Sequence, residues 1–294
     1  MRVFVTGATG FIGTELVKEL IKAGHQVRGL TRSEEGAEQL KATGAEPHRG
    51  TLTDLESLRS GTKDMDAVVH LAFSHDFANF AQNAIDEQHA IDALGSSMEP
   101  GKLLVVTSGT GLASGAPGHL RLESDPPAEN SHVPRRPEQK AKAFVDKGLR
   151  VAVVRLPQVH DTHKQGLVPL LTQLAREKGE SAYIGDGSAR WAAAPLPAVA
   201  ELYRRVVEQN GDGYTVYHAV QEEGVSMKEV AETLGKGLNV PVVSITPEQA
   251  PAHFGWFAGF AGLDMPASSE WTQKTLGWNP VGPGLIEDLT NMKY

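Results

Sequence analysis

The sequence predicts an α/β protein with a doubly wound parallel sheet and a smaller, mostly helical C-terminal domain. In the first half of the chain, short β-branched runs alternate with longer amphipathic segments, which is the pattern of strands joined by helical crossovers. Three of these runs, Ala67–Leu71, Leu103–Thr107 and Val151–Leu156, are almost continuously apolar. Strands of a parallel sheet are buried on both faces, so this composition indicates a sheet covered by helices on both sides.

The expected elements follow one another in regular order. Gly24 suits the left-handed position after a helix, and Asp54 is a suitable helix N-cap. Besides the three runs above, strands are expected at Val3–Thr6, Gln26–Leu30, Ala45–Arg49, Tyr183–Ile184, Val216–Ala219 and Val242–Ile245. Helices are expected at Ile12–Ala23, Glu34–Ala42, Asp54–Arg59, Ala78–Leu94, Glu138–Lys147, Leu167–Lys178, Val199–Gln209 and Met227–Leu234.

The segment from Gly109 to Arg135 breaks this pattern. It is rich in glycine, proline, serine and charged residues, and it follows the C-terminal end of a central strand. A loop of that length in a compact domain is usually functional or disordered. Because ligands of open α/β sheets bind at the carboxyl ends of the strands, a functional loop is the favoured interpretation.

Composition excludes several classes of protein. The chain has 28 basic and 36 acidic residues, a net charge of −8, which argues against a dedicated nucleic-acid binder. It has no cysteine, so disulfides, thiolate catalysis and zinc–thiolate sites are excluded. The first residues run directly into a strand, and no apolar stretch reaches about 18 residues. We therefore expect a cytoplasmic protein with neither a membrane nor a nucleic acid as partner.

The most informative motif lies at the start of the chain. Gly7, Gly10 and Gly13 follow a predicted strand directly and open a predicted helix. In such a loop the first glycine permits a tight turn, the second lets the backbone approach a pyrophosphate, and the third packs helix against strand. The anion then lies at the positive end of the helix dipole. This spacing predicts a dinucleotide cofactor.

The form of this motif, Thr6-Gly7-Ala8-Thr9-Gly10-Phe11-Ile12-Gly13, resembles the extended short-chain dehydrogenase/reductase family, which includes the NAD(P)-dependent epimerases and dehydratases. Further similar segments are Val69-His70-Leu71-Ala72, Thr107-Ser108 and Arg155-Leu156-Pro157-Gln158-Val159. The segments Arg190-Trp191, His253-Phe254-Gly255-Trp256 and Leu276-Gly277-Trp278 are similar to an atypical branch of that family. The resemblance spans essentially the whole chain.

The resemblance implies a Rossmann domain and a substrate domain. We expect the dinucleotide-binding domain over residues 1–160, with residues 190–219 returning to it, and the substrate-binding domain over residues 161–189 and 220–294. It also implies a small-molecule substrate. Whether the chain forms a homodimer stays open. The expected cofactor contacts are Gly7, Thr9, Gly10, Phe11, Ile12, Gly13, Arg32, Ser33, Thr51, Leu52, Leu71, Ala72, Phe73, Thr107, Lys140, Pro157 and Val159.

The end of the second strand bears on the choice of cofactor. An NAD site has a carboxylate there to hold the ribose hydroxyls. This chain has Arg32 and Ser33 instead, and arginine binds phosphate bidentately. We therefore expect NADP, with NAD the less favoured alternative. No set of residues has the spacing of a metal site; the group His160-Asp161-Thr162-His163 lacks a helical pairing and a third ligand.

The catalytic residues depart from the family pattern. The family carries a Tyr-x-x-x-Lys pair, and the matching positions here are Arg136 and Lys140. By the resemblance, Lys140 would hold the nicotinamide ribose. Arginine stays protonated, so Arg136 is suited to stabilise an oxyanion but not to donate a proton. The family's hydroxyl position falls near Gly109, so Ser108 and Thr110 are both candidates.

Histidines are the candidate replacements for the tyrosine, because their ordinary pKa suits proton transfer at neutral pH. His75 and His160 follow predicted strands at the ligand edge and are the first candidates; His119 and His163 are others. A further departure lies at Pro195 and Ala198, where family members commonly carry a histidine and an aspartate.

The late aromatic residues bear on the substrate. Trp191, Phe254, Trp256, Phe257 and Phe260 are expected to include a pocket wall, while Trp271 and Trp278 are assigned to the core. A partly apolar carbonyl or imine compound fits such a wall, and an NADPH-dependent reductase is the leading hypothesis. An isomerase or epimerase with permanently bound NAD(P), and a catalytically silent NADP-binding sensor, stay open.

Overall fold

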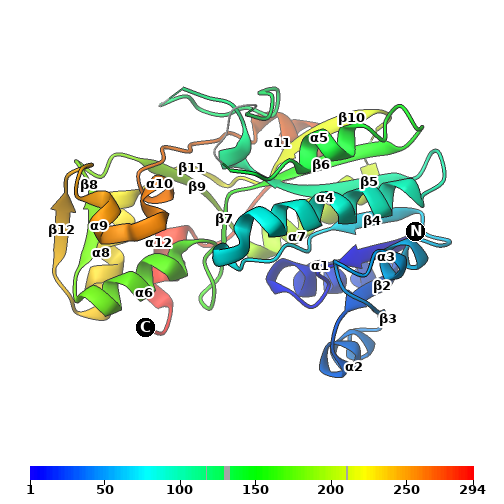
Figure 1. Cartoon of the computed structure of the whole chain (residues 1–294), viewed down its shortest axis with the longest axis horizontal. Coiled ribbons are helices and arrows are strands. Elements are labelled where there is room, and N and C mark those ends of the chain that lie inside the picture. The colour runs from blue at the N-terminus through cyan, green and yellow to red at the C-terminus, as the bar shows by residue number, and fades with distance from the viewer. Residues whose placement is uncertain (117, 129–132, 210) are drawn as a thin grey trace.

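The computed structural model describes residues 1–116, 118–128, 133–209 and 211–294, and its centre is a seven-stranded parallel sheet (Figure 1). The strand order is β10-β6-β5-β4-β1-β2-β3. From β1 the chain adds β2 and β3 on one side and β4, β5 and β6 on the other, so the topological switch point lies between β1 and β4. Ligands of open α/β sheets bind at such a switch point, on the edge formed by the carboxyl ends of the strands, which we call the carboxyl edge. The strands are β1 Arg2–Thr6, β2 Gln26–Thr31, β3 Glu46–Arg49, β4 Ala67–His70, β5 Leu103–Gly109, β6 Arg150–Leu156 and β10 Tyr214–His218.

Helices cover both faces of this sheet, which confirms the predicted fold class. Val3 and Val5 of β1 point into a core shared with α1, α2 and α7, whereas Phe4 between them points into a core shared with α3, α4 and α5. The period of two along each strand therefore buries both faces. The helices are α1 Phe11–Lys22, α2 Glu34–Ala42, α3 Leu55–Gly61, α4 Phe80–Ser96, α5 Pro137–Lys142 and α7 Leu196–Gln209.

A smaller unit lies beside the sheet and contains the chain's C-terminus (Figure 1). Its core is built around buried Trp191, Phe254 and Phe257. One small sheet has the order β11-β9-β7, and β8 pairs with β12. The strands are β7 Gln158–His160, β8 Ser181–Ile184, β9 Arg190–Pro195, β11 Glu222–Ser226 and β12 Val242–Ile245. Its helices are α6 Val168–Lys178, α8 Met227–Leu238, α9 Ala250–Phe254, α10 Ala258–Ala261 and α12 Leu285–Asn291. Helix α11 Glu270–Leu276 instead packs on α7 and contributes Leu276 to the main core. Short 3-10 turns lie along the chain at Phe77–Asn79, Thr110–Leu112 and Gly255–Phe257.

The segment 190–219 divides between the two sheets. Strand β10 returns to the edge of the main sheet beside β6, and α7 packs on α1. Strand β9, in contrast, pairs with β7 and β11 of the small sheet. Residues 190–195 and 222–226 contain few β-branched residues, so their strand conformation comes from long-range pairing that no local pattern indicates.

The loop predicted between Gly109 and Arg135 is present, although residues 117 and 129–132 of it lie outside the described residues. Arg121 ties it to the small unit: its backbone N–H donates to the Pro266 carbonyl at 3.0 Å, and its guanidinium donates to the Asp264 carbonyl at 2.9 Å. The loop therefore lies across both units at the end of β5.

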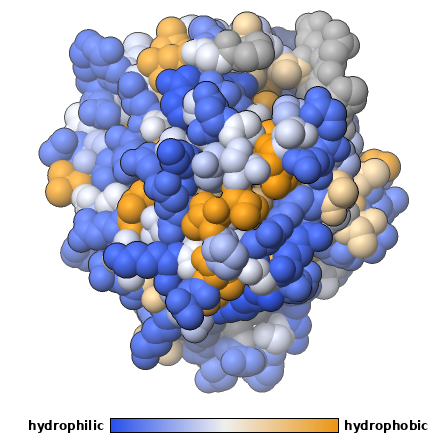
Figure 2. Space-filling view, turned by 90° about the vertical axis from the view of Figure 1, so that its left-hand side faces the viewer, coloured by the Kyte–Doolittle hydropathy of each residue, from blue (hydrophilic) through white to orange (hydrophobic). Residues whose placement is uncertain are grey.

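Hydrophilic residues cover most of the face at the small-unit end, with hydrophobic residues gathered in a small group near its middle (Figure 2). Among the described residues, no helix combines the length and the apolar character that a membrane crossing requires.

Candidate cofactor-binding and active site

The glycine loop forms a cradle between β1 and α1. Gly7 has a φ of +70°, and a Cβ added there would lie 2.9 Å from the backbone nitrogen of Ala72. A Cβ at Gly13 would lie 2.0 Å from the Gly7 carbonyl oxygen. The fold itself therefore requires glycine at both positions. A Cβ at Gly10 would meet only the Gly7 carbonyl oxygen, at 3.1 Å, so the outer side of the loop is open.

This cradle fits the pyrophosphate of a dinucleotide. Gly10 is the N-cap of α1 and provides no side-chain cap, so the first N–H groups of this 12-residue helix point toward the open side of the loop. Free N–H groups and the positive end of a helix dipole together favour an anion. The residues present thus fit the phosphate groups of NAD(P).

The carboxyl ends of β2 and β3 would meet the adenosine half. Arg32 is exposed directly after β2. The Ser33 hydroxyl caps α2, where it accepts the N–H of Gly36 at 3.1 Å. Arg49 at the end of β3 lies 3.9 Å from the Glu34 carboxylate. The Thr51 hydroxyl accepts the N–H of Asp54 at 3.0 Å, and Leu52 packs against the core beside it. Arg32 is thus exposed to solvent, while Ser33 shapes the helix start.

The loop after β4 would meet the nicotinamide half. His70, the last residue of β4, shares a 2.8 Å hydrogen bond between its Nδ1 and the Thr6 hydroxyl. Its Nε2 is buried and has no hydrogen-bond partner among the described residues. Burial, together with the charge of Arg135, lowers the pKa of His70 to about 4. The ring is therefore neutral at physiological pH, beneath the loop formed by Leu71, Ala72 and Phe73.

Arg135 is the cation at the centre of the carboxyl edge, and sequence reasoning missed it. Its Nε donates to a Glu87 carboxylate oxygen on α4 at 3.0 Å, and its Nη2 donates to the Thr107 carbonyl at 3.4 Å. The guanidinium lies 4.0 Å above the centre of the Phe73 ring. The only signal in the sequence was the pair of consecutive arginines, from which Arg136 was chosen.

Ser108 belongs to a buried ion-pair network. Its hydroxyl donates to Glu138 Oε1 at 2.7 Å, and Arg155 donates to both oxygens of the same carboxylate at 2.9 and 2.8 Å. Glu138 and Arg155 are almost completely buried. His218 lies 3.3 Å from Arg155, and burial lowers the pKa of its ring. The Ser108 proton is therefore directed at Glu138 and is not free for a substrate.

The two residues at the positions of the family's Tyr–Lys pair point in different directions. One Arg136 nitrogen donates to the carbonyls of Val133 and Arg135, at 2.5 and 2.8 Å. Lys140 forms an ion pair of 2.7 Å with Asp92 on α4. Arg136 lines a pocket together with Ser108 and Arg135, whereas the ammonium group of Lys140 is held by α4.

The other candidates have distinct environments. His75 lies on the loop after β4, where burial and the charges of Arg135 and Lys164 lower its pKa. The Thr107 hydroxyl is bonded to the buried Tyr203 hydroxyl at 2.7 Å, and the Thr110 hydroxyl donates to the Leu156 carbonyl at 3.4 Å. His160 is completely buried and bonded to Asp288 at 2.6 Å. This burial argues against His160 as a proton donor to a substrate.

The remaining sequence candidates differ in burial and in their hydrogen-bond partners. Val159 is buried in the main core, next to partly exposed Pro157. His119 pairs with Asp125 at 2.7 Å within the long loop. The backbone N–H of His163 donates to Asp161 at 2.7 Å. Among the described residues, no group of three metal-ligating side chains is arranged to hold an ion.

The aromatic assignments need correction. Trp191 and Phe257 are 0–1% exposed and belong to the core of the small unit, so they do not line an open pocket. Phe254 is 4% exposed and lines a small pocket within that unit. Trp271, which was assigned to the core, is 46% exposed, whereas Trp278 is buried as expected. The indole N–H of Trp191 donates to the Leu263 carbonyl at 3.1 Å, which satisfies its one polar group.

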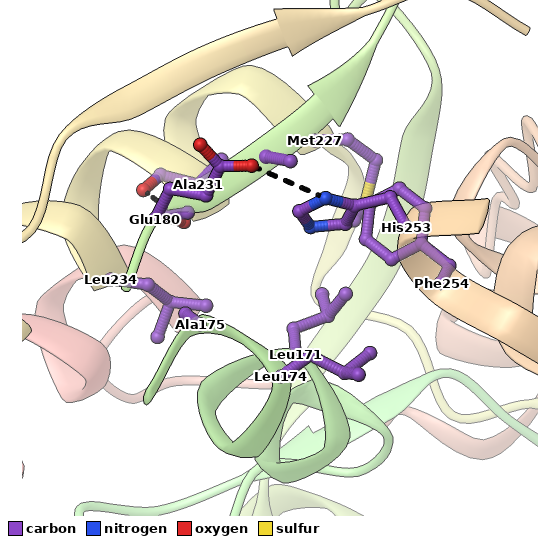
Figure 3. A pocket seen from close by; sticks show the side chains of 11 residues that line it. Leu171, Leu174, Ala175, Glu180, Met227, Ala231, Leu234, His253 and Phe254 are labelled. Atoms are coloured by element: carbon purple, nitrogen blue, oxygen red, sulfur yellow. Dashed lines mark hydrogen bonds and ion pairs between the residues drawn. The ribbon is translucent and has the colours of Figure 1, made fainter. Parts of the chain in front are cut away.

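Two small pockets compete as substrate sites. One lies in the small unit, where Leu171 and Leu174 face Phe254 and where His253 points at Glu180 across 3.5 Å (Figure 3). The other lies at the carboxyl edge and is lined by Ser108, Arg135 and Arg136. Each has a volume of about 10 Å³, roughly the space of one water molecule, so size does not decide between them. The second is the candidate site because charged groups converge on it.

Comparison with known proteins agrees with the fold and the glycine cradle. The model of the NAD dependent epimerase/dehydratase family matches residues 3–219. The chain is 42% identical to an uncharacterized protein of Saccharomyces cerevisiae, over 98% of both chains. It is 27% identical to a 4-hydroxy-2-methyl-3-oxo-4-farnesyl-3,4-dihydroquinoline-1-oxide ketoreductase of Stigmatella aurantiaca, over 87% of this chain and 80% of that one.

Solved structures share the fold over nearly the whole chain. A UDP-glucose 4-epimerase of Thermotoga maritima superposes with a TM-score of 0.73 at 20% identity, covering 99% of this chain and 97% of that one. At that identity the likeness extends to the fold and not to the reaction.

Proposed function

Because the chain belongs to the NAD dependent epimerase/dehydratase family, we propose that it is an NADP(H)-dependent oxidoreductase that reduces a small, partly apolar carbonyl or imine compound. The observation that carries this proposal is the glycine cradle, whose first and third glycines are required by backbone contacts while its outer side is open to an anion. A ketoreductase that is similar over 87% of this chain and 80% of its own supports the direction of the reaction.

Arg32 supports NADP over NAD. It is exposed at the end of β2, and no described residue forms a hydrogen bond or ion pair with its side chain. A 2′-phosphate would gain a charge-assisted hydrogen bond there, whereas an unphosphorylated ribose would gain little. In Arg32→Ala we expect NADPH to bind about 10–100-fold more weakly and NADH to bind unchanged, because one such bond contributes about 1.5–3 kcal/mol. Calorimetric titration of both cofactors measures this.

Arg59→Ala is the matched control for that titration. Arg59 is an exposed arginine on α3 that pairs only with Glu56 among the described residues. It should leave both affinities unchanged. Equal affinity of the parent protein for NADH and NADPH would contradict the preference for NADP.

The nicotinamide, when bound, would supply hydride exchange with the substrate carbon. The chain's own residues would orient the substrate at the carboxyl-edge pocket and stabilise negative charge on its oxygen. Arg136 lines that pocket, and Arg135 adds a second guanidinium, although the Glu87 carboxylate offsets its charge. A fixed cation near a developing oxyanion lowers the barrier without donating a proton.

The proton would come from His75 or from solvent. A lowered pKa leaves His75 neutral at pH 7, so its acid form becomes abundant only below the ordinary histidine value of 6.5. We therefore expect turnover to rise as the pH falls below neutrality. In His75→Gln this rise should be absent from the pH–rate profile. A profile unchanged by this substitution would assign the proton to solvent.

A catalytically silent NADP-binding sensor is the second candidate. The missing tyrosine and the engagement of Lys140 with Asp92 favour it, because neither member of the family's proton-transfer pair is in place. Oxidation of NADPH with a panel of aldehydes, ketones and imines separates the two functions. Turnover that falls in Arg136→Ala supports the oxidoreductase, while tight binding without turnover for any compound supports the sensor.

A further inference from the structure

A tight turn after β7 brings a lysine toward the glycine loop. The Asp161 carboxylate accepts the backbone N–H groups of His163 and Lys164, both at 2.7 Å. The Asp161 backbone N–H donates to the Lys164 carbonyl at 2.9 Å, and the side-chain amide of Gln165 donates to the Asp161 carbonyl at 2.8 Å. Four hydrogen bonds thus fix the turn Asp161–Gly166. Because β7 pairs with β9, the turn is part of the small unit.

Lys164 extends from this turn across the boundary to the main sheet. Its Nζ lies 5.5 Å from the centre of the Phe11 ring, and Phe11 is the first residue of α1. Its charge also contributes to the lowered pKa of His75, which lies on the loop after β4. The ammonium group is therefore close to both loops that border the switch point between β1 and β4.

The Lys164 ammonium group has no polar partner among the described residues. Lys164 is exposed, and its Nζ has no hydrogen bond or ion pair among the described residues. Most other basic residues near the carboxyl edge are neutralised, Arg135 by Glu87 and Arg155 by Glu138. A distance of 5.5 Å from the ring is near the outer limit of a cation–π contact, so that contact alone does not account for the position.

We propose that Lys164 binds the phosphate groups of the dinucleotide from the small unit, and that the turn Asp161–Gly166 is a phosphate clamp facing the glycine loop. This inference rests on the proposed function. The cradle supplies backbone N–H groups and the helix dipole but no cationic side chain, so the Lys164 ammonium group beside Phe11 completes the neutralisation. Cofactor binding would then connect the two units.

The test compares cofactor affinities of variants in the absence of any substrate. We expect Lys164→Gln to weaken NADPH binding about 10–100-fold, the effect of losing one hydrogen bond between charged groups. Lys164→Arg should restore most of the affinity. Binding by the parent should also weaken more steeply with added salt than binding by Lys164→Gln, because one charge contact is missing in the variant. Lys228→Gln, which changes an exposed lysine on α8, is the matched control.

Two fragments locate the contact on the cofactor. Adenosine 2′-monophosphate lacks the pyrophosphate, so its affinity should be the same for the parent and for Lys164→Gln. The affinity of 2′-phospho-ADP-ribose, which keeps the pyrophosphate, should fall as that of NADPH does. Asp161→Ala, which removes the acceptor for two N–H groups of the turn, should also weaken the binding of NADPH. Asp161→Asn should recover part of the lost affinity.

The outcomes separate the clamp from the proposed function. Failure of the parent protein to bind any dinucleotide refutes the oxidoreductase and the clamp together. Normal binding by the parent with unchanged affinity in Lys164→Gln refutes only the clamp. If Lys164→Gln weakens the binding of adenosine 2′-monophosphate as much as that of NADPH, the lysine contacts another phosphate and the clamp is overturned. If the variant keeps its cofactor affinity but has a raised KM for the substrate, the lysine contacts the substrate and the clamp is again overturned.

Discussion

Arg135 and Arg136 are neighbours in the sequence, yet their side chains have different surroundings in the fold. The sequence predicted Arg136 at the ligand edge, but which of the two neighbours reaches Glu87 depends on where α5 begins. Arg136 is the N-cap, with φ −138° and ψ 44°, and Pro137 opens the helix. That backbone sends the two side chains in different directions, so Arg135 lies over Phe73 while Arg136 turns to carbonyls of its own loop.

The side-chain partners of Ser108 and Lys140 could not be predicted from the sequence. Both were placed by their spacing from a motif, yet each has a carboxylate partner distant in sequence, Glu138 and Asp92 respectively. Pairings of this kind depend on how α4 and α5 pack, which no local pattern encodes. The glycine positions, in contrast, follow from backbone geometry within one loop and were predictable.

His70 should make stability depend on pH. Its folded-state pKa of about 4 lies below the ordinary value of 6.5, so the unfolded chain binds more protons between these limits. The contribution is complete above pH 6.5 and is lost as the pH falls toward 4, up to about 3 kcal/mol. Urea unfolding of the parent and of His70→Asn at pH 7.5, 6 and 5 measures it. The variant should lose less stability on acidification, and identical slopes for the two proteins would contradict the assignment.

Among the elements, those with local signals were predicted well and those without were not. The strands β1, β4, β5 and β6 are apolar runs buried on both faces, and α2 was predicted with the bounds it has. Strands β7, β9 and β11 were not expected, because they pair across long stretches of chain. Helix α5 ends at Lys142, earlier than expected, where the chain changes to turns before Gly148 at φ +84°.

The glycine loop should separate a folding defect from a binding defect. A Cβ at Gly13 meets the Gly7 carbonyl at 2.0 Å, so Gly13→Ala must displace backbone and lower the free energy of unfolding, by about 1–3 kcal/mol as overpacking does. Gly10→Ala meets only one atom, at 3.1 Å, and its methyl group points to the open side of the loop. We expect Gly10→Ala to fold with nearly parental stability and to lose NADPH affinity.

Thermal unfolding and cofactor titration of the two variants provide the measurement. Gly7→Ala is a further reference, because its φ of +70° and the 2.9 Å approach to Ala72 predict a loss of stability as well. A stable Gly13→Ala, or a Gly10→Ala with parental affinity, would show that the cradle is not the binding loop we describe.

On the scale of the whole molecule, the chain's last helix holds the segment that leads from the main sheet into the small unit. In α12, the Asp288 carboxylate bonds to His160 of β7 at 2.6 Å, and the Leu285 N–H donates to Glu222 of β11 at 2.7 Å. Strand β7 follows directly after β6 of the main sheet, and the phosphate clamp follows directly after β7. The C-terminal helix therefore fixes the segment that links the main sheet to the small unit.

Asp288→Ala should loosen this junction without unfolding the main sheet. It leaves His160 buried without its carboxylate partner, a loss of about 1.5–3 kcal/mol for a hydrogen bond to a charged group. Parts of a protein chain unfold locally as cooperative units. Hydrogen exchange should therefore accelerate in β7, β11 and α12, while β1, β4 and β5 keep their protection. Asp288→Asn, which keeps an acceptor for the ring, should lie between the two. Uniform acceleration across the main sheet would mean that the units unfold together, and cofactor binding could then not act as the connection between them.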